Sequence, residues 1–171
     1  MRTSPEPSPE IQVLTISEDC IEGYCACPDA VARERLYLGF VEAPPLESTR
    51  GFVRGVIADG IPQFVAVVGE QVIGWCDVLP MKMEGFTHCG ELGMGVCRAY
   101  RGQGIGRRLL TAALARAREF GLERVELEVF ASNTPAVRLY QSEGFLLEGV
   151  KGKVRFLDGV YDDLLMMAKF I

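Results

Sequence analysis

The chain is organised around the stretch Glu91–Gly121, which reads ELGMGVCRAYRGQGIGRRLLTAALARAREFG. The apolar segment from Leu92 to Val96 predicts a short strand, and the glycine-rich segment Arg101–Gly106 follows it. Apolar residues then recur at helical spacing as far as Gly121, a typical C-terminal stop. A glycine-rich loop that opens a helix exposes unpaired N–H groups at the positive end of the helix dipole. The stretch therefore predicts an anion-binding site.

The charges around this loop agree with an anionic ligand. The chain has a net charge of −5, yet no Asp or Glu occurs between Glu91 and Glu119. The same interval contains the arginines Arg98, Arg101, Arg107, Arg108, Arg116 and Arg118. We expect Arg107 and Arg108 to contact phosphates, and Arg116 and Arg118 to form a solvated helix face.

Two familiar phosphate-binding loops do not fit this segment. A dinucleotide fingerprint G-x-G-x-x-G that starts at Gly102 or Gly104 would need its third glycine at Arg107 or Leu109. The P-loop needs a lysine, which this segment lacks. The remaining pattern is Arg101-x-x-Gly104-x-Gly106.

With a strand before it and an amphipathic helix after it, this pattern resembles the acetyl-CoA pyrophosphate loop of the GNAT acetyltransferase superfamily. The downstream segment Asn133-x-x-Ala136-x-x-Leu139-Tyr140-x-x-x-Gly144-Phe145 resembles the superfamily segment that carries a CoA-contacting Asn and a Tyr near the thiol sulfur. The resemblance implies acetyl-CoA as cosubstrate. It implies the following cofactor-binding residues: Met94, Val96, Arg101, Gly102, Gln103, Gly104, Ile105, Gly106, Arg107, Asn133 and Tyr140.

The order of predicted elements gives the fold class. Strands are predicted at 11–16, 64–68, 72–79, 88–96, 124–130, 145–156 and 160–170, and helices at 19–27, 28–37, 46–59, 105–120 and 134–142. This order favours a mixed α/β layer with helices on both faces. The resemblance to the GNAT fold adds a mostly antiparallel sheet whose central strands, 91–97 and 124–130, splay apart around acetyl-CoA. It is closest to the branch of bacterial enzymes that acetylate amino acids and analogues such as phosphinothricin.

Length and composition argue against several other classes of protein. The chain of 171 residues fits one domain over 11–171, after a Pro-, Ser- and Glu-rich tail over 1–10 that we expect to be disordered. The acidic net charge argues against nucleic acid, and no apolar run is long enough for a membrane span. The six cysteines are interpreted as reduced thiols of a cytoplasmic protein, and Cys25-x-Cys27 lacks the second pair of a metal site. The oligomeric state stays open, with a homodimer as one expectation.

Acetyl transfer to an amine needs a proton acceptor, and three side chains compete for that role. Glu91 stands five residues before Val96, and in the phosphinothricin-type branch a Glu at this distance from the loop is the proposed base. His88 is the rival because its ordinary pKa suits proton transfer. Asp77 on the neighbouring strand is a weaker rival, and water could also relay the proton.

The transfer also needs an oxyanion donor and a proton for the leaving thiolate. Gly93 and Gly95 predict a β-bulge that would free the backbone N–H of Met94 or Val96. The resemblance assigns the proton to Tyr140, whose ordinary pKa of ~10 lies just above the ~8.5 of a thiol. Without the resemblance, Tyr140 would be interpreted as a packing residue.

These features predict an N-acetyltransferase that moves acetyl from acetyl-CoA to a primary amine of a small molecule, with no metal ion. The alternatives are an enzyme that acetylates a protein N-terminus or lysine, which should have an open acidic groove, and a non-catalytic acyl-CoA-binding module. The acceptor itself stays undetermined, since its binding residues are expected from the loops at 39–50 and 80–90. Trp75 and Phe130 could line an acceptor pocket, although buried packing explains either of them.

Overall fold

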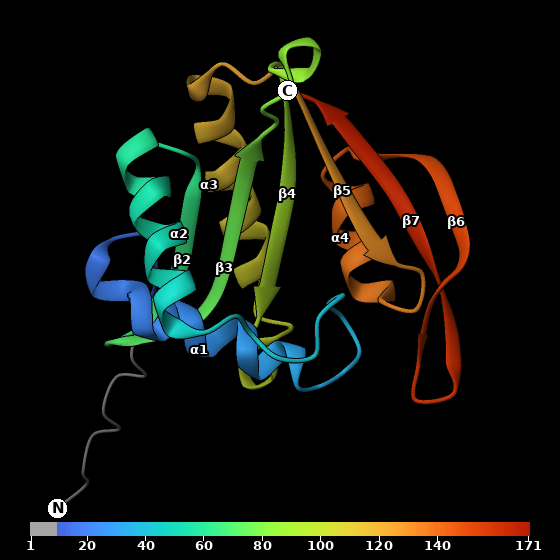
Figure 1. Cartoon of the computed structure of the whole chain (residues 1–171), viewed down its shortest axis with the longest axis horizontal. Coiled ribbons are helices and arrows are strands. Elements are labelled where there is room, and N and C mark those ends of the chain that lie inside the picture. The colour runs from blue at the N-terminus through green and yellow to red at the C-terminus, as the bar shows by residue number, and fades with distance from the viewer. Residues whose placement is uncertain (1–9) are drawn as a thin grey trace, which may run out of the picture.

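A computed structural model describes residues 10–171, so the predicted tail lies outside the described residues except for Glu10. The described chain forms one seven-stranded sheet in the order β1-β2-β3-β4-β5-β7-β6 (Figure 1). The strands are β1 (Ile11–Thr15), β2 (Gln63–Val68), β3 (Gln71–Pro80), β4 (Cys89–Val96), β5 (Arg124–Phe130), β6 (Leu146–Leu157) and β7 (Val160–Phe170). The helices are α1 (Ile21–Ala32), α2 (Leu46–Asp59), α3 (Ile105–Phe120) and α4 (Thr134–Ser142).

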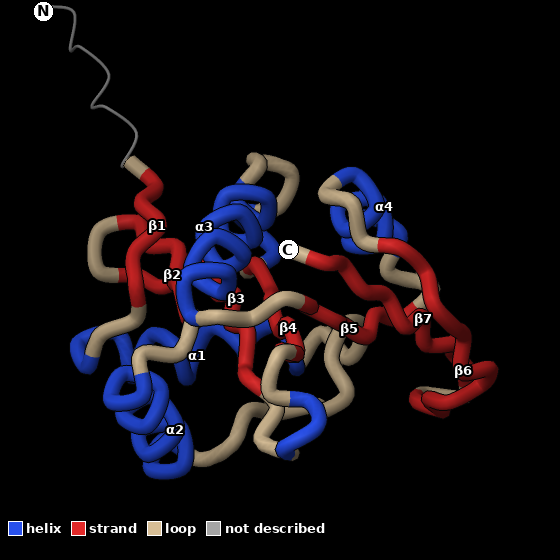
Figure 2. The backbone as a smooth tube through the Cα atoms, turned by 90° about the horizontal axis from the view of Figure 1, so that it is seen from above, coloured by secondary structure: helices blue, strands red, loops and turns tan. Residues whose placement is uncertain are grey.

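The helices cover both faces of the sheet, as predicted. Figure 2 shows α1 and α2 on one side of the strands and α3 and α4 on the other. Successive side chains of a strand point to opposite faces, so β3 contributes to two separate cores. Trp75 belongs to the core under α1 and α2, whereas Cys76 and Val78 belong to the core under α3.

The sheet has one parallel junction, between β4 and β5. All its other strand pairs are antiparallel. At the junction, pairing covers only residues 89–91 of β4 and 124–126 of β5. Beyond these residues the two strands diverge (Figure 1). The predicted fold, including the splayed central strands, is confirmed.

The helical prediction around Pro28 is wrong. The sequence predicted one helix that ends before Pro28 and a second that continues to Tyr37, but α1 runs through Pro28 and ends at Ala32. Its buried face continues across the proline, from Tyr24 to Val31, so burial offsets the hydrogen bond that a proline cannot donate. Arg35 has a positive φ of 60°, which is incompatible with a continuing helix. No helix within residues 10–171 has the length and apolar character that a membrane crossing requires.

Candidate active site

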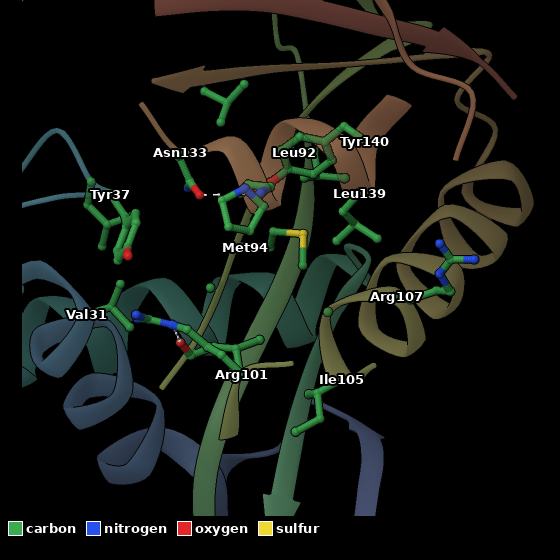
Figure 3. A pocket seen from close by; sticks show the side chains of 18 of the residues that line it. Val31, Tyr37, Leu92, Met94, Arg101, Ile105, Arg107, Asn133, Leu139 and Tyr140 are labelled. Carbon is green, nitrogen blue, oxygen red and sulfur yellow. Dashed lines mark hydrogen bonds between the residues drawn. The ribbon is translucent and has the colours of Figure 1, made fainter. Parts of the chain in front are cut away.

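A cavity of about 440 Å³ occupies the gap between β4 and β5 (Figure 3). Its walls come from β4, the glycine-rich loop, the start of α3, and α4, with Val31, Tyr37 and Leu38 on the remaining side. Most of the residues predicted to bind the cofactor line it: Met94, Val96, Arg101, Gly102, Gly104, Ile105, Gly106, Arg107, Asn133 and Tyr140. Gln103 is exposed and lies outside the lining.

The glycine-rich loop presents backbone N–H groups to this cavity. Gly102 and Gly104 both have a φ of +76°, which glycine adopts readily and other residues rarely do. Helix α3 begins without a side-chain cap, and its first hydrogen bond runs from the Arg108 N–H to the Gly104 carbonyl, at 3.1 Å. The N–H groups of residues 102–107 make no hydrogen bond within the described chain. Such a row of free donors fits a pyrophosphate group.

The Arg101 side chain fixes the loop rather than offering a free charge. Its Nε donates to the Val96 carbonyl at 2.8 Å, and its Nη atoms donate to the Glu34 carboxylate at 2.9 and 2.6 Å. The guanidinium also lies over the Tyr37 ring, 4.7 Å from its centroid. Arg101 therefore holds the segment after α1 against the end of β4, which leaves anion contacts mainly to the backbone.

Arg107 and Arg108 also have protein partners. Arg107 donates to the Ser142 hydroxyl at 2.9 Å and forms an ion pair with Glu143 at 3.3 Å, both beside α4. Arg108 donates to the Ile11 carbonyl at 2.9 Å and does not line the cavity. Of these two, Arg107 is the one placed to reach a bound phosphate.

The predicted β-bulge at Gly93 and Gly95 is wrong. The β3–β4 pairing keeps one register from Gly74–Val96 to Pro80–Gly90. The glycines make room for side chains on β3 instead: a Cβ atom on Gly95 would lie 2.3 Å from the Trp75 ring, and one on Gly93 would lie 3.1 Å from the Asp77 carboxylate. Glycine therefore serves here for close approach between neighbouring strands.

The splay of β4 and β5 exposes the N–H donors that the bulge was expected to free. The Cys89 carbonyl accepts from the Met81 N–H, and the Cys97 N–H donates to the Ile73 carbonyl, so odd-numbered residues of β4 direct their backbone groups toward β3. Backbone direction alternates along a strand. The N–H groups of Met94 and Val96 consequently face the gap, where β5 no longer pairs with them.

Helix α4 places Asn133 and Tyr140 on the opposite wall (Figure 3). Asn133 caps the helix, since its side-chain oxygen accepts from the Ala136 N–H at 3.4 Å. Tyr140 is buried, with its ring edge against Phe145, and its hydroxyl makes no hydrogen bond within residues 10–171. Burial raises the pKa of Tyr140, and the nearby Cys76 raises it further. A thiolate in the same cavity would be desolvated too, so the two pKa values would rise together.

A second cavity, of about 420 Å³, lies on the α1 and α2 side of the sheet. Its lining includes residues 38–44, α1, α2 and β3, and it shares Leu38, Gly93 and Met94 with the first cavity. Within the described chain, the loop at 39–50 contributes to the lining of the second cavity only, and residues 80–90 contribute to neither lining. Trp75 is both buried and part of this lining, whereas Phe130 packs under Arg155 instead.

The three candidate bases occupy different environments. Asp77 is 6% exposed and lines the second cavity; burial raises its pKa to about 7, and the charge of Glu91 adds to this rise. Glu91 and His88 are both exposed and line neither cavity. Glu91 and Asp77 nevertheless share a face of the sheet, because Glu91 pairs with Leu79. The sequence analysis ranked Asp77 as a weaker rival, and its position within the apolar segment 72–79 is the signal that favours it.

Comparisons with known proteins agree with this geometry. The profile of the acetyltransferase (GNAT) family matches residues 30–145. The L-amino acid N-acetyltransferase AaaT of Escherichia coli (strain K12) is 28% identical over 111 residues, which cover 64% of this chain and 68% of that protein. An N-alpha-acetyltransferase of Saccharolobus solfataricus is 30% identical over 132 residues, which cover 69% of this chain and 74% of that protein.

A solved structure shows the same fold. It is a phosphinothricin acetyltransferase of Sinorhizobium meliloti in complex with AcCoA, which matches with a TM-score of 0.87 and 16% identity over 94% of this chain and 88% of that chain. The family profile covers more than half of the chain, including β4, the glycine-rich loop and α4. The chain therefore belongs to the GNAT family of acetyltransferases.

Proposed function

We propose that the enzyme transfers acetyl from acetyl-CoA to the primary amine of a small molecule, an amino acid or an analogue, within a ternary complex. One observation carries the proposal: the gap with the free loop N–H groups meets the second cavity at Gly93 and Met94. A cosubstrate in the gap and an amine in the second cavity would meet beside the Met94 N–H. The names of the Escherichia coli and Sinorhizobium meliloti proteins support a small amine as acceptor.

Each step of the proposed reaction has a protein group available. The amine nitrogen attacks the thioester carbonyl carbon, a C–N bond forms, and the C–S bond breaks. The Met94 or Val96 N–H would stabilise the carbonyl oxygen as it gains charge. Tyr140 would give its proton to the leaving thiolate, and the amine would lose a proton to a base. Glu91 would act on that proton through water or through its charge on Asp77. This scheme uses no metal ion.

The shape of the second cavity supports a small acceptor over a protein. The name of the Saccharolobus solfataricus relative favours the alternative, an N-terminal acetyltransferase of proteins. A protein substrate would need an open acidic groove, whereas this cavity lies between α1, α2 and residues 38–44, and its lining is mostly apolar. A catalytically silent acyl-CoA-binding module is the other alternative.

The test is a panel of primary amines and short peptides with acetyl-CoA, followed by detection of the free CoA thiol. We expect release of thiol with small amines and little with peptides. Turnover confined to peptides would favour the protein acetyltransferase. Calorimetric binding of acetyl-CoA without turnover on any acceptor would favour the silent module.

We also propose that the protein forms a homodimer in a reducing cytoplasm. Strands β6 and β7 carry exposed apolar side chains, among them Leu146, Phe156 and Phe170 at 72%, 62% and 75% exposure, and a second copy could cover them. All six cysteines are free thiols, which suits a reducing compartment. Light scattering of wild type and of Phe156→Ser would test the dimer, and a monomeric wild type would refute it.

A further inference from the structure

The second cavity contains a single charge. Its lining is dominated by apolar and aromatic side chains such as Phe40, Phe52 and Trp75. Asp77 is the only ionisable carboxylate that lines it, and no lysine, arginine or histidine among residues 10–171 does so. An apolar cavity with one buried carboxylate offers a site for an apolar molecule with one positive charge.

The Asp77 carboxylate faces the meeting point of the two cavities without an ion partner. It lies across from Gly93 in the β3–β4 register, and the missing Cβ of that glycine leaves the space beside its Oδ1 open. Within the described chain no cationic side chain forms an ion pair with it, and the polar groups beside it are Tyr24, Gln63 and the Gly93 backbone. A buried carboxylate without a countercharge is costly even beside neutral polar groups, and a bound cation would relieve that cost.

We propose that the second cavity binds primary amines that have an apolar body and no carboxylate, and that Asp77 holds their ammonium group and then takes up its proton. The inference rests on the proposed acetyl transfer to a primary amine, and it replaces the amino acids named there by amines that lack a carboxylate. The proton leaves the ammonium for the Asp77 carboxylate, the neutral amine attacks the thioester carbon, and Asp77 returns the proton to solvent after the product leaves.

The same cavity disfavours free amino acids. An α-carboxylate is two bonds from its ammonium group, so it would lie close to the Asp77 carboxylate. No cationic side chain of the described residues lines the cavity to compensate this repulsion. Removing the carboxylate from an aromatic amino acid should therefore improve binding, although it removes a possible contact.

The pH dependence follows from the groups around Asp77. Burial raises the pKa of Asp77 to about 7, and the groups near it are Tyr24 on α1, Cys76 on its own strand and Glu91 on β4, while α2 contributes no charged side chain to the lining. An alkylamine keeps its proton up to a pH of ~10. Amine binding should thus strengthen as pH rises from 6 to 8, because Asp77 ionises while the amine stays charged.

Trp75 provides a direct readout, since it is the only tryptophan and lines this cavity. Its fluorescence should report binding of 2-phenylethylamine, its neutral analogue 2-phenylethanol, and L-phenylalanine, all without turnover. We expect 2-phenylethylamine to bind at least tenfold more tightly than L-phenylalanine. Asp77→Asn should weaken amine binding at least tenfold and leave 2-phenylethanol binding unchanged, which also shows that the cavity is folded. Asp59→Asn, an exposed carboxylate at the end of α2, is the matched control.

The outcomes separate this inference from the proposed function. Equal or tighter binding of L-phenylalanine, or unchanged amine binding in Asp77→Asn, overturns the inference. Amine binding that depends on Asp77, combined with no acetyl transfer from acetyl-CoA, supports the binding site and overturns the proposed function. Acetylation of 2-phenylethylamine that Asp77→Asn slows at least a hundredfold, with acetyl-CoA binding retained, supports both.

Discussion

The two cavities on either side of β4 are built in opposite ways. The gap between β4 and β5 takes most of its lining from one continuous stretch, 92–107, and presents backbone N–H groups. The second cavity takes side chains from α1, residues 38–44, α2 and β3, which are distant in sequence. A backbone site leaves a local pattern of glycines, whereas a side-chain site assembled from several elements leaves none. The comparison explains why the sequence could propose a ligand for the first cavity and none for the second.

The largest effect should come from breaking the backbone site at Gly104. Gly104→Val places a β-branched residue at a φ of +76°, so the loop must move and its N–H groups lose their alignment. We expect acetyl-CoA affinity, measured by calorimetry, to fall by more than about a hundredfold, since several charge-assisted hydrogen bonds are lost together. Gly55→Val is the control, because Gly55 is exposed on α2 and has an ordinary φ with open space around it. Unchanged affinity in a folded Gly104→Val would show that the loop is not the cofactor site.

A second prediction concerns the wall opposite the loop, at Tyr140. Tyr140→Phe keeps the ring and its contact with Phe145 but removes the proton. We expect kcat to fall by about a hundredfold while KM for acetyl-CoA changes less. Stability should change little, because the hydroxyl makes no hydrogen bond within the described chain.

A thioester with a better leaving thiol is the control for that variant. It needs less proton assistance, so the loss of the Tyr140 hydroxyl should matter less. An equal loss with every acyl donor, or a clear loss of stability in thermal unfolding, would identify Tyr140 as a structural residue.

Local sequence patterns predicted most of the helices and strands. Alternation in residues 124–130, helical spacing after Gly104, and the stops at Gly121 and Gly144 each predicted an element that the structure contains. Where a prediction failed, tertiary packing had overridden the local sequence pattern. Helix α1 continues through Pro28 because the neighbouring residues pack on the sheet. Gly95 makes room for the Trp75 ring and does not form a bulge.

The same limit applies to the candidate site. Most of the residues that line the gap come from two segments, 92–107 and 133–140, so two local motifs and their resemblance to a family proposed them together. The burial of Asp77 depends on Tyr24, Gln63 and the neighbouring strands, which no local pattern brings together. Glu91 was chosen by its distance from the loop along the chain, and that distance carries no information about which cavity it faces.

A third prediction concerns the free energy of unfolding, which the buried Asp77 carboxylate of the second cavity lowers at high pH. The pKa of Asp77 is about 7 in the folded state against an ordinary 3.8, so the folded state binds this proton more tightly. The stabilisation of the fold by this tighter proton binding is fully present below about pH 4 and is lost as pH rises to 7. The difference between the two pKa values corresponds to roughly 4 kcal/mol of unfolding free energy. Asp77→Asn should therefore be more stable than wild type at pH 8 by about 1–2 kcal/mol, because part of the gain is spent on burying the amide. The gain should vanish at pH 4.

Urea unfolding at the two pH values measures this difference. Asp59→Asn should show no such pH dependence, because that carboxylate is exposed. If Asp77→Asn lost stability relative to wild type on going from pH 4 to pH 8, the result would contradict a buried carboxylate without a countercharge.

The smallest effect is expected at Glu91, and it decides which carboxylate belongs to the acceptor cavity. Glu91 is exposed and lines neither cavity, but its negative charge is one cause of the raised pKa of Asp77. Glu91→Gln should lower kcat/KM at pH 8 by less than about threefold, since exposed charges interact weakly through water. It should also move the acidic limb of the pH profile to lower pH, because Asp77 then loses its proton more easily. Glu123→Gln, another exposed carboxylate, should leave the profile unchanged. If Glu91→Gln instead reduced kcat tenfold or more without moving the acidic limb, Glu91 would be the base, as the sequence predicted, and Asp77 would have only a binding role.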